Sequence, residues 1–557
     1  MRQEINTIHR RIFSSRVAAA VFVVSVMTIG VLLFMAIERY LTNMKFAYVT
    51  GVYAPLVAYE TKEIFKDVVG VASAAAGLIE WGKETRSDDS SNEAIGNSRT
   101  VSIPVLLYHG IIPKADGTDV TIDNFREQMF ALKRAGYEAV SMSDVLGYMK
   151  GENLFPPKPV VITFDDGRKD SYYPTDPIFK ALGYKAVIYV VTQYSFFKED
   201  SHYYLVESEL KKMNESGRWE IEAHAKEGHT YFPIDKFGDT GHFYTNLLWK
   251  SGLGRLETPE EQKLRIRNDL GGAYDDIAGQ IGKPPISFAV PFGDLGQNSK
   301  NYKDVYPVFL SELRARYSVV VSQDAPSVMF RQNYFDEIGR DSASFLLRRI
   351  SVSPDWSADD LLVNLESSRA KELPYSDDFD VAEGWIPNTW GKIDSGKGYL
   401  RIGADQDTTG SVAVLDGTRG WKDYDMRAHI SSVKGSNFYL WVRVADSENY
   451  AACNFGRDLA HVEQTVNGER RVIRGNVSVL RPYSSEEGSS GTQDIEARAV
   501  VNGRTLECYY NGQLVVKSDF LDPSLSSGGA GFKVWDEKLG ESDLMIDKFE
   551  VTAPNAF

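Results

Sequence analysis

Residues Val160–Gly167 read VVITFDDG, an apolar run that ends in two adjacent carboxylates and a glycine. Short apolar runs that end at a turn are typical of buried strands, and we place this strand at Pro159–Phe164. Similar runs alternate with helix-patterned segments on both sides of it, an order that predicts a parallel sheet covered by helices. With about seven strands in the series, a closed or distorted α/β barrel is the expected fold.

The other strands of this series are expected at Ser102–His109, Glu138–Met142, Tyr184–Thr192, Trp219–Ala223, Ile286–Val290, Tyr317–Ser322 and Leu346–Val352. Two early helices are expected at Ile122–Ala135, with Asp123 as the N-cap, and at Ser143–Lys150. Residues 101–373 are therefore assigned to one α/β domain.

From about residue 374 the pattern changes to alternating apolar and polar residues, as in Asn437–Ala445 and Leu506–Lys517. Asn-Gly pairs at 467–468, 502–503 and 511–512 predict β-hairpins, because both positions of such a turn need positive φ. Residues 374–557 are expected to form an antiparallel β-sandwich of the jelly-roll type.

The N-terminal part carries an uncharged apolar run, Val17–Ile37. At about 1.5 Å per residue it is long enough for a hydrocarbon core of roughly 30 Å. Four arginines precede it, which predicts a cytoplasmic N-terminus and an extracytoplasmic location for the rest of the chain, periplasmic or on the cell surface. Residues 1–40 are therefore interpreted as a single-pass membrane anchor and 41–100 as a juxtamembrane helix and linker, with a cleaved signal peptide as the alternative.

The composition is that of a folded protein, with 43% hydrophobic and 25% charged residues. A net charge of -15 argues against a nucleic-acid partner, because phosphate binding needs clustered Lys and Arg. The two cysteines, Cys453 and Cys508, could be buried thiols or one disulfide, and the sequence leaves both open.

The two carboxylates of the quoted stretch, Asp165 and Asp166, lie where barrel enzymes carry catalytic groups, at the carboxyl end of a strand. If both were buried without a partner they would repel one another. A bound cation resolves this, since one carboxylate can bind the ion while the other acts as a base. An Asp-Asp-Gly sequence can also be an ordinary turn with solvated acids.

Two histidines, His224 and His229, follow another strand of the series. A five-residue offset brings them together only if the chain turns between them, which Gly228 permits. One Asp and two His leave coordination positions open, as in catalytic metal sites. Non-haem iron oxygenases use the same ligand set, and an isolated histidine pair is more often structural.

These motifs resemble those of the polysaccharide deacetylases, a carbohydrate esterase family, and most of all its poly-N-acetylglucosamine branch. Thr163–Gly167 is similar to the first motif, His224-x-x-x-x-His229 to the second and Phe288–Gly293 to the third, while Pro104–Ile111 is similar to the opening strand. The resemblance implies that Asp165 is the base and that Asp166, His224 and His229 bind a divalent metal, with zinc expected. It also implies that Pro291, Phe292 and Gly293 line the substrate groove.

The sequence departs from the family pattern in three places. Ala289 stands where an arginine often orients the base, and no tryptophan-bearing fourth motif is found near 318–345. The last strand reads FLLRRISV, so Arg348 and Arg349 stand near the position of the usual acid histidine, and an arginine cannot donate a proton usefully. His109, at the end of the first strand, is the candidate acid, although it could equally be a structural histidine.

Two further regions carry aromatic residues. The long loop Thr230–Glu257 could line the substrate groove or cover a small core of its own. The C-terminal sandwich resembles concanavalin-like and laminin-G-like domains, so its tryptophans could form a sugar platform, although most sandwich tryptophans are core residues. They are Trp385, Trp390, Trp421, Trp441 and Trp535.

The expected function is that of a membrane-anchored, metal-dependent deacetylase that removes N-acetyl groups from an N-acetylhexosamine polysaccharide. An O-acetyl esterase, a catalytically weak glycan-binding protein and an iron oxygenase are the alternatives. The expected partners are the acetylated polysaccharide, the membrane and, as a candidate, a polysaccharide synthase or export machinery.

Overall fold

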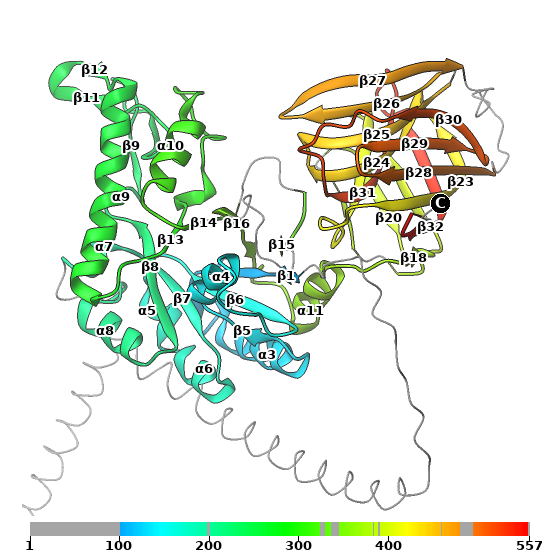
Figure 1. Cartoon of the computed structure of the whole chain (residues 1–557). Helices are drawn as coiled ribbons and strands as arrows, with labels where there is room; N and C mark the ends of the chain where they lie inside the picture. Colours follow the sequence, from blue (N-terminus) through cyan, green and yellow to red (C-terminus); the bar gives the residue numbers. More distant parts are fainter. Residues whose placement is uncertain are drawn as a thin grey trace, which may run out of the picture.

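The computed structural model describes residues 101–197, 201–323, 329–335, 345–381, 384–387, 390–457, 459–478 and 494–554. They form an α/β body and an antiparallel β-sandwich (Figure 1). The expected membrane anchor and juxtamembrane helix lie outside these residues. Within them, no helix has both the length and the apolar character needed to cross a bilayer.

The α/β body is built on one sheet whose strands all pair in parallel. In spatial order its main path is β16 (Leu346–Arg348), β14 (Val319–Ser322), β13 (Ser287–Ala289), β8 (Trp219–Ala225), β7 (Ala186–Val191), β6 (Pro159–Phe164), β2 (Val105–Tyr108) and β17 (Ile350–Ser351). A short strand, β5 (Glu138–Ala139), also pairs with β6. The predicted barrel-like parallel sheet is confirmed.

The two ends of this path are neighbours in the sequence. Only Arg349 separates β16, which pairs with β14, from β17, which pairs with β2. One chain segment therefore closes the sheet, and Arg349 sits at the break between its two halves. The expected single strand Leu346–Val352 is thus interrupted at Arg349, whose side chain forms a buried ion pair with Asp165.

Helices cover the outside of this sheet, and both faces of β6 and β7 are buried along their whole length, as expected for parallel strands. They are α3 (Ile122–Arg134), α4 (Met142–Met149), α5 (Lys169–Tyr172), α6 (Asp176–Leu182), α7 (Thr192–Ser195), α8 (Glu207–Glu215), α9 (Pro259–Ile281), α10 (Val305–Arg314) and α11 (Ala358–Ser367). Two short 3-10 helices lie at Ser251–Leu253 and Pro291–Gly293.

Several predicted boundaries are wrong because side chains at the caps decide them. Helix α3 is capped by Thr121, whose hydroxyl accepts the Asn124 N–H at 3.3 Å, so Asp123 lies in the first turn instead. Strand β5 is short because Ser141 caps α4. The expected strand Ser102–His109 is split at Pro104, which lacks an N–H. Its first part, β1 (Val101–Ile103), pairs antiparallel with β15 (Asn333–Phe335).

The loop Thr230–Glu257 contains two small hairpins, β9 (Tyr231–Pro233) with β10 (Thr240–His242) and β11 (Trp249–Lys250) with β12 (Arg255–Leu256). Phe243 and Tyr244, which follow β10, are buried in the main core of the α/β body, whereas Tyr231 is exposed. Part of the loop therefore belongs to the main core and part of it is surface, while its place in a substrate groove stays a prediction. A separate two-stranded pair, β3 (Ile111–Ile112) with β4 (Val120–Thr121), lies before α3.

The predicted sandwich is confirmed as two antiparallel sheets. One contains β18 (Tyr375–Asp377), β20 (Lys392–Ser395), β21 (Leu400–Gly403), β32 (Asp543–Thr552), β23 (Tyr424–Lys434), β28 (Ile495–Asn502), β29 (Thr505–Tyr510) and β30 (Gln513–Ser518). The other contains β19 (Trp385–Pro387), β22 (Gly410–Leu415), β31 (Gly529–Trp535), β24 (Asn437–Asp446), β25 (Asn449–Gly456), β26 (Leu459–Val466) and β27 (Glu469–Ser478).

Two of the three Asn-Gly pairs form the expected turn with positive φ at both positions, at 467–468 and at 511–512. At 502–503 the expected hairpin also forms, between β28 and β29, but its turn begins one residue later, because Asn502 is the last residue of β28 and of the pair only Gly503 has positive φ. Register pairs Asn502 with Thr505, so the turn residues are Gly503 and Arg504.

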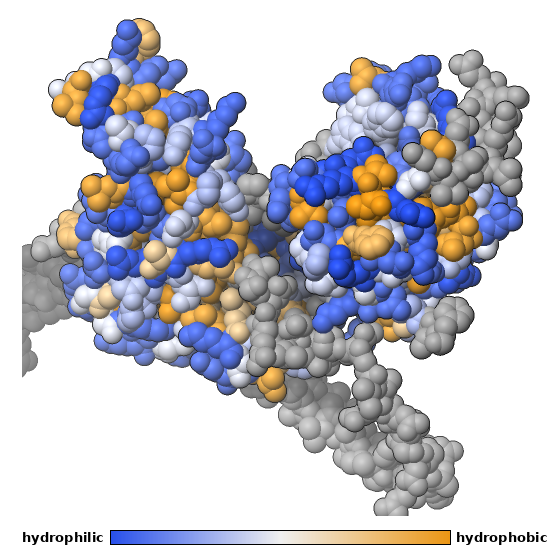
Figure 2. Space-filling model, turned by 45° about the horizontal axis from the view of Figure 1, so that its top comes forward, coloured by the Kyte–Doolittle hydropathy of each residue, from blue (hydrophilic) through white to orange (hydrophobic). Residues whose placement is uncertain are grey.

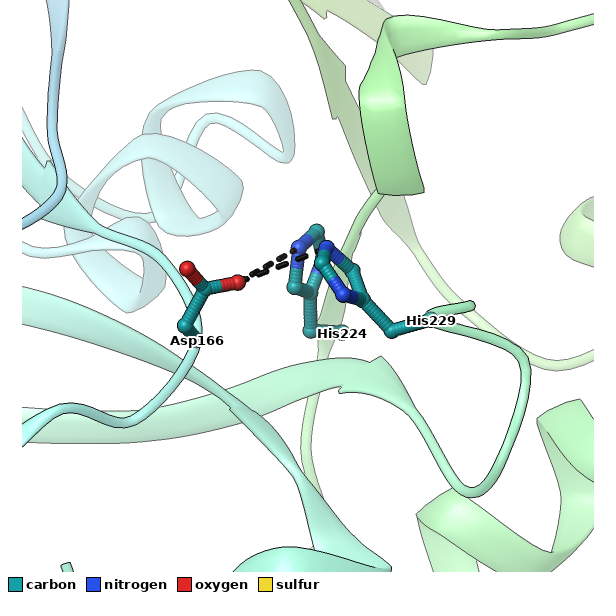
Figure 3. Close-up of side chains that lie close together, drawn as sticks. All are labelled: Asp166, His224 and His229. Atoms are coloured by element: carbon teal, nitrogen blue, oxygen red, sulfur yellow. Dashed lines mark ion pairs between the residues drawn. The ribbon is translucent and has the colours of Figure 1, made fainter. Parts of the chain in front are cut away.

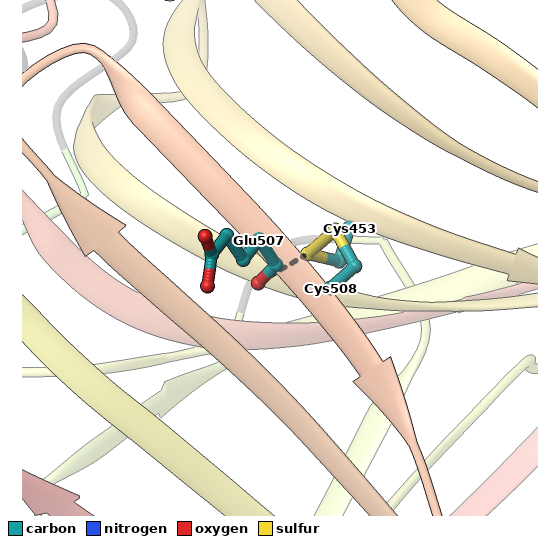
Figure 4. The surroundings of a disulfide bond; sticks show 3 residues. All are labelled: Cys453, Glu507 and Cys508. Atoms are coloured by element: carbon teal, nitrogen blue, oxygen red, sulfur yellow. Dashed lines mark hydrogen bonds between the residues drawn. A yellow bond between two sulfur atoms is a disulfide. The ribbon is translucent and has the colours of Figure 1, made fainter. Parts of the chain in front are cut away.

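Cys453 of β25 and Cys508 of β29 form a disulfide that links the two sheets (Figure 4). Of the five sandwich tryptophans, Trp385, Trp421 and Trp441 are buried and only Trp390 and Trp535 are partly exposed. Most of the tryptophans are therefore core residues.

The α/β body contacts the sandwich through the segment that precedes and includes β15. Phe330 packs among Val412, Val414 and Trp441 of the sandwich. The Tyr334 hydroxyl donates to Asp416 Oδ1 at 2.9 Å. In the face shown in Figure 2, both bodies are mainly hydrophilic at their edges, and hydrophobic side chains gather toward the middle of the α/β body.

Candidate metal centre

Asp165 and Asp166 follow β6 directly, and the backbone sends their side chains in different directions. Asp166 and Gly167 have φ of 70° and 68°, a left-handed conformation that Asp tolerates better than most residues. Asp165 is 2% exposed, while the side chain of Asp166 is 20% exposed. The two adjacent acids, for which the resemblance implied different roles, thus lie in different surroundings.

The two histidines are brought together by a tight turn. Asp269 of α9 accepts the backbone N–H groups of Lys226 at 3.0 Å and Glu227 at 2.8 Å, and it also accepts the Tyr244 hydroxyl. Gly228 packs so closely on the Tyr244 ring that a Cβ there would lie 2.5 Å from it. Asp269 and Tyr244 therefore hold the turn that the His224–His229 spacing required.

Three of the predicted site residues meet at one point (Figure 3). His224 Nε2 lies 3.7 Å and His229 Nε2 lies 3.4 Å from Asp166 Oδ1. One potential ligand atom from each of the three residues lies within 4.8 Å of the others. The two imidazole rings lie side by side and face the Asp166 carboxylate (Figure 3).

These residues fit a divalent metal ion. Asp166 Oδ1 is buried and has no hydrogen-bond partner among the described residues, so this carboxylate oxygen is available to bind a cation. His224 Nδ1 lies 2.8 Å from the Ala289 carbonyl and must donate to it, which leaves the Nε2 lone pair free. Burial lowers the pKa of His224 to about 4, so the ring is neutral and able to bind a metal.

Asp165 is held by an arginine that the sequence analysis did not assign to the site. Arg349 Nη1 and Nη2 donate to the two carboxylate oxygens at 2.6 Å and 2.7 Å. Burial raises the pKa of Asp165, but the Arg349 guanidinium outweighs it and the pKa ends well below its usual range. Asp165 is therefore ionised and fixed in orientation.

Arg349, on the last strand, makes with Asp165 the contact that the family pattern places on an arginine at position 289. It is 1% exposed and lies at the break between β16 and β17. The sequence did contain a hint, because an arginine inside an apolar barrel strand needs a buried acidic partner. Ala289 takes part in the site through its carbonyl group instead.

His109 lies at the carboxyl end of β2, the neighbour of β6, and it is exposed. The charge of His109 is one of the causes that act on the pKa of Asp165, after burial and the charges of Arg349 and His224. The role of His109 as the proton donor stays a prediction.

Pro291, Phe292 and Gly293 follow β13 on the same rim. Pro291 and Gly293 are buried, so Phe292 is the member of the three with exposed surface. Its ring stacks on His229 with a centroid distance of 4.6 Å. That these residues contact the substrate stays a prediction.

The fold and this cluster define the class of the protein as an α/β barrel with a candidate metal site at the carboxyl ends of its strands. Residues 153–306 match the family model described as "Polysaccharide deacetylase". This match agrees with the resemblance that the motifs of the α/β domain indicated.

A curated relative is the poly-beta-1,6-N-acetyl-D-glucosamine N-deacetylase of Escherichia coli (strain K12), which is 27% identical over 180 residues, or 30% of this chain. The match spans only 27% of the length of that relative. A de-N-acetylase structure from Aggregatibacter actinomycetemcomitans aligns with 47% of this chain and 98% of its own, at 20% identity and a TM-score of 0.39. The carbohydrate binding module CBM66 from Bacillus subtilis aligns with 30% of this chain and 94% of its own, at 18% identity and a TM-score of 0.23.

Proposed function

We propose that this protein is a membrane-anchored, metal-dependent deacetylase that removes N-acetyl groups from an N-acetylhexosamine polysaccharide. The main support for the proposal is that two groups of residues lie side by side at the carboxyl ends of the barrel strands. Asp166, His224 and His229 converge on one point, and beside them Asp165 is held ionised by Arg349.

The roles follow from the surroundings of each residue. Zinc is the expected ion, and when bound it supplies a Lewis acid that polarises a carbonyl and lowers the pKa of water toward about 7. Asp165 accepts the proton from the attacking water, and Arg349 keeps the Asp165 oxygens in one orientation. His109 donates a proton to the leaving amine.

The substrate class is supported by the relatives. The Escherichia coli relative is named for poly-beta-1,6-N-acetyl-D-glucosamine, and the residues that match the family model, 153–306, include the metal cluster. An O-acetylated polysaccharide is the neighbouring alternative, because the same groups hydrolyse an ester.

Two features support a location outside the cytoplasm. The uncharged run Val17–Ile37, preceded by arginines, predicts a single membrane span with the N-terminus inside. The Cys453–Cys508 disulfide fits an oxidising compartment. A polysaccharide synthase or export machinery in the same membrane is a candidate partner.

Acetate release from the purified full chain tests the proposal. The substrates are β-1,6- and β-1,4-linked N-acetylglucosamine oligomers, peptidoglycan and an O-acetylated glycan, each before and after metal removal by a chelator. We expect release from the N-acetylated oligomers that is lost with the chelator and restored by zinc. Release from the O-acetylated glycan alone would make the protein an esterase, and binding without release from any substrate would make it a glycan-binding protein.

A further inference from the structure

A stack of aromatic rings runs from the metal ligand His229 to the β9–β10 hairpin. Phe292 stacks on His229 at 4.6 Å with an interplanar angle of 24°, and on His242 at 4.5 Å with an angle of 8°. Tyr231 completes the group, with its ring centroid 4.9 Å from His242 and 5.2 Å from Phe292. The metal centre is thus continuous with a surface built from the inserted loop.

The backbone of Phe292 is strained to place its ring there. Phe292 has φ of 59° and ψ of 9°, a left-handed conformation that is rare for a bulky residue. Such strain persists only where the surrounding structure enforces it, and it gathers at functional sites. Contact with both His229 and His242 is what this conformation achieves.

His242 is fixed in orientation by a buried carboxylate. Its Nδ1 lies 2.6 Å from Asp294 Oδ2, an atom that also accepts the Thr245 hydroxyl at 2.6 Å. Asp294 Oδ1 accepts the backbone N–H groups of Gly296 and Asn298, so Asp294 itself cannot rotate. The Nδ1 of His242 is therefore occupied, and its Nε2 has no hydrogen-bond partner among the described residues.

Tyr231 presents the outermost surface of the stack. It is 55% exposed, and strand register pairs it directly with His242 across the hairpin. Paired residues of an antiparallel ladder lie on the same face, so the Tyr231 ring and the His242 imidazole face the same side. An exposed aromatic ring beside a fixed polar nitrogen matches a sugar, which has an apolar C–H face bordered by hydroxyl groups.

We propose that Tyr231, His242 and the exposed part of Phe292 form a saccharide subsite next to the metal centre. The subsite binds the unit of the polysaccharide that neighbours the acetylated unit under attack. The Tyr231 ring stacks on the C–H face of that unit, and His242 Nε2 hydrogen-bonds one of its hydroxyl groups. The inference rests on the proposed function for the identity of the ligand, and it adds which residues of this chain contact the neighbouring sugar unit.

The dependence of activity on oligomer length tests the subsite. We compare kcat/KM of the full chain for the dimer and the pentamer of N-acetylglucosamine in the wild type, Tyr231→Ala and His242→Phe. The second variant keeps an aromatic ring in the stack and removes the nitrogen. We expect the pentamer-to-dimer ratio to fall about tenfold in Tyr231→Ala and several-fold in His242→Phe, mainly through KM, since tenfold corresponds to about 1.4 kcal/mol.

The matched control is Phe237→Ala. Phe237 lies on the same hairpin between β9 and β10, is 83% exposed and has a ring contact with Lys236 only among the described residues. We expect it to keep the wild-type ratio. A wild-type ratio in both Tyr231→Ala and His242→Phe, with normal zinc content and melting temperature, would overturn the subsite. If Tyr231→Ala fails to fold, Tyr231→Leu replaces it.

A protein without deacetylase activity can be distinguished from one without the subsite by a binding measurement. If the wild type releases no acetate from any oligomer, calorimetric binding of the pentamer to the wild type and Tyr231→Ala decides the question. Weaker binding by the variant supports the subsite on a protein without deacetylase activity. Equal binding, or none by the wild type, overturns it.

Discussion

At the scale of single residues, a change at Arg349 is expected to affect the proposed base and to leave the proposed metal site intact. It contacts both oxygens of Asp165 and is not one of the three clustered ligands. We expect Arg349→Met to lower kcat/KM about 100-fold or more, because a preorganised charge is lost, while zinc content stays at the wild-type level. Removing the guanidinium raises the pKa of Asp165, so the acid limb of the pH profile of kcat/KM moves to higher pH.

The control for this variant is the adjacent arginine. Arg348 donates to the Phe330 carbonyl at 2.8 Å, and Arg348→Lys is expected to keep the wild-type rate and profile. Because an unpaired buried carboxylate destabilises by about 3–5 kcal/mol, the melting temperature of Arg349→Met is measured alongside, and Arg349→Lys retains the charge without the paired geometry. An unshifted acid limb in a folded Arg349→Met would contradict the assignment.

Asp269 acts on the metal through the backbone and not by contact. Its carboxylate holds the turn between the two histidine ligands, so Asp269→Asn is expected to weaken zinc binding about tenfold, as is typical when a group that supports a ligand is lost. Competition with a chromophoric chelator measures the affinity. Asp275→Asn, at an exposed position on the same helix, should bind zinc as the wild type does. Equal affinities for the two variants would show that the turn needs no support from α9.

Arg349 and Asp269 also show which parts of the site could not be predicted from the sequence. The Asp-Asp-Gly strand end and the histidine pair were local patterns, and they were sufficient to predict the residues that cluster. Arg349 and Asp269 act on groups 184 and 43 positions away in the chain. Such contacts depend on how the strands and helices pack, and hydrophobic periodicity contains no information on that packing.

At the scale of the elements, strand β8 is coupled to β13 through a buried acid. Glu222 Oε2 accepts the backbone N–H groups of Ile286 and Ser287 at 2.9 Å and 2.6 Å, and also the Ser287 hydroxyl. Burial, followed by the charge of Glu220, raises the pKa of Glu222 to about 8. The folded state therefore keeps a proton that the unfolded state releases above its ordinary pKa of 4.5.

The contribution of this proton to stability is complete below pH 4.5 and is lost as the pH rises through about 8. We expect the free energy of unfolding of the wild type to fall by an amount on the order of a few kcal/mol over that window, and Glu222→Gln to lack this component. Hydrogen exchange of the β8 and β13 amides at pH 5.5, 7 and 8.5 measures it. If the free energy of unfolding changed with pH in the same way in the wild type and in Glu222→Gln, the prediction would be wrong.

The bounds of a strand could be predicted where nearby residues determine them, and could not where a contact with a distant residue does. Strand β6 begins and ends at the predicted residues, because an apolar run bounded by Pro159 and Asp165 defines it locally. The last strand was predicted as one piece and is two, because its centre is occupied by an ion pair with another strand. A hydrophobic pattern could place the strand but could not show that interruption.

At the scale of the whole molecule, the sandwich carries a stabilising link of its own. Cys453 and Cys508 are 55 residues apart and join its two sheets. A closed loop of that length stabilises by about 4 kcal/mol in the chain-entropy model. We expect Cys453→Ser with Cys508→Ser to lower the unfolding temperature of the sandwich in calorimetry, while the transition of the α/β body stays as an internal reference. An unchanged sandwich transition would contradict this.

The closure of the barrel at Arg349 has a consequence for the order of folding. The ligands Asp166, His224 and His229 follow β6 and β8, which are complete long before the end of the domain is synthesised. The partner of Asp165 arrives only with the segment between β14 and β2, the last to enter the sheet along the chain. A nascent or refolding chain can therefore assemble its ligands while the base still lacks an orientation. For a protein with the proposed function, we therefore expect metal binding to be recovered before acetate release, which requires insertion of the final strand.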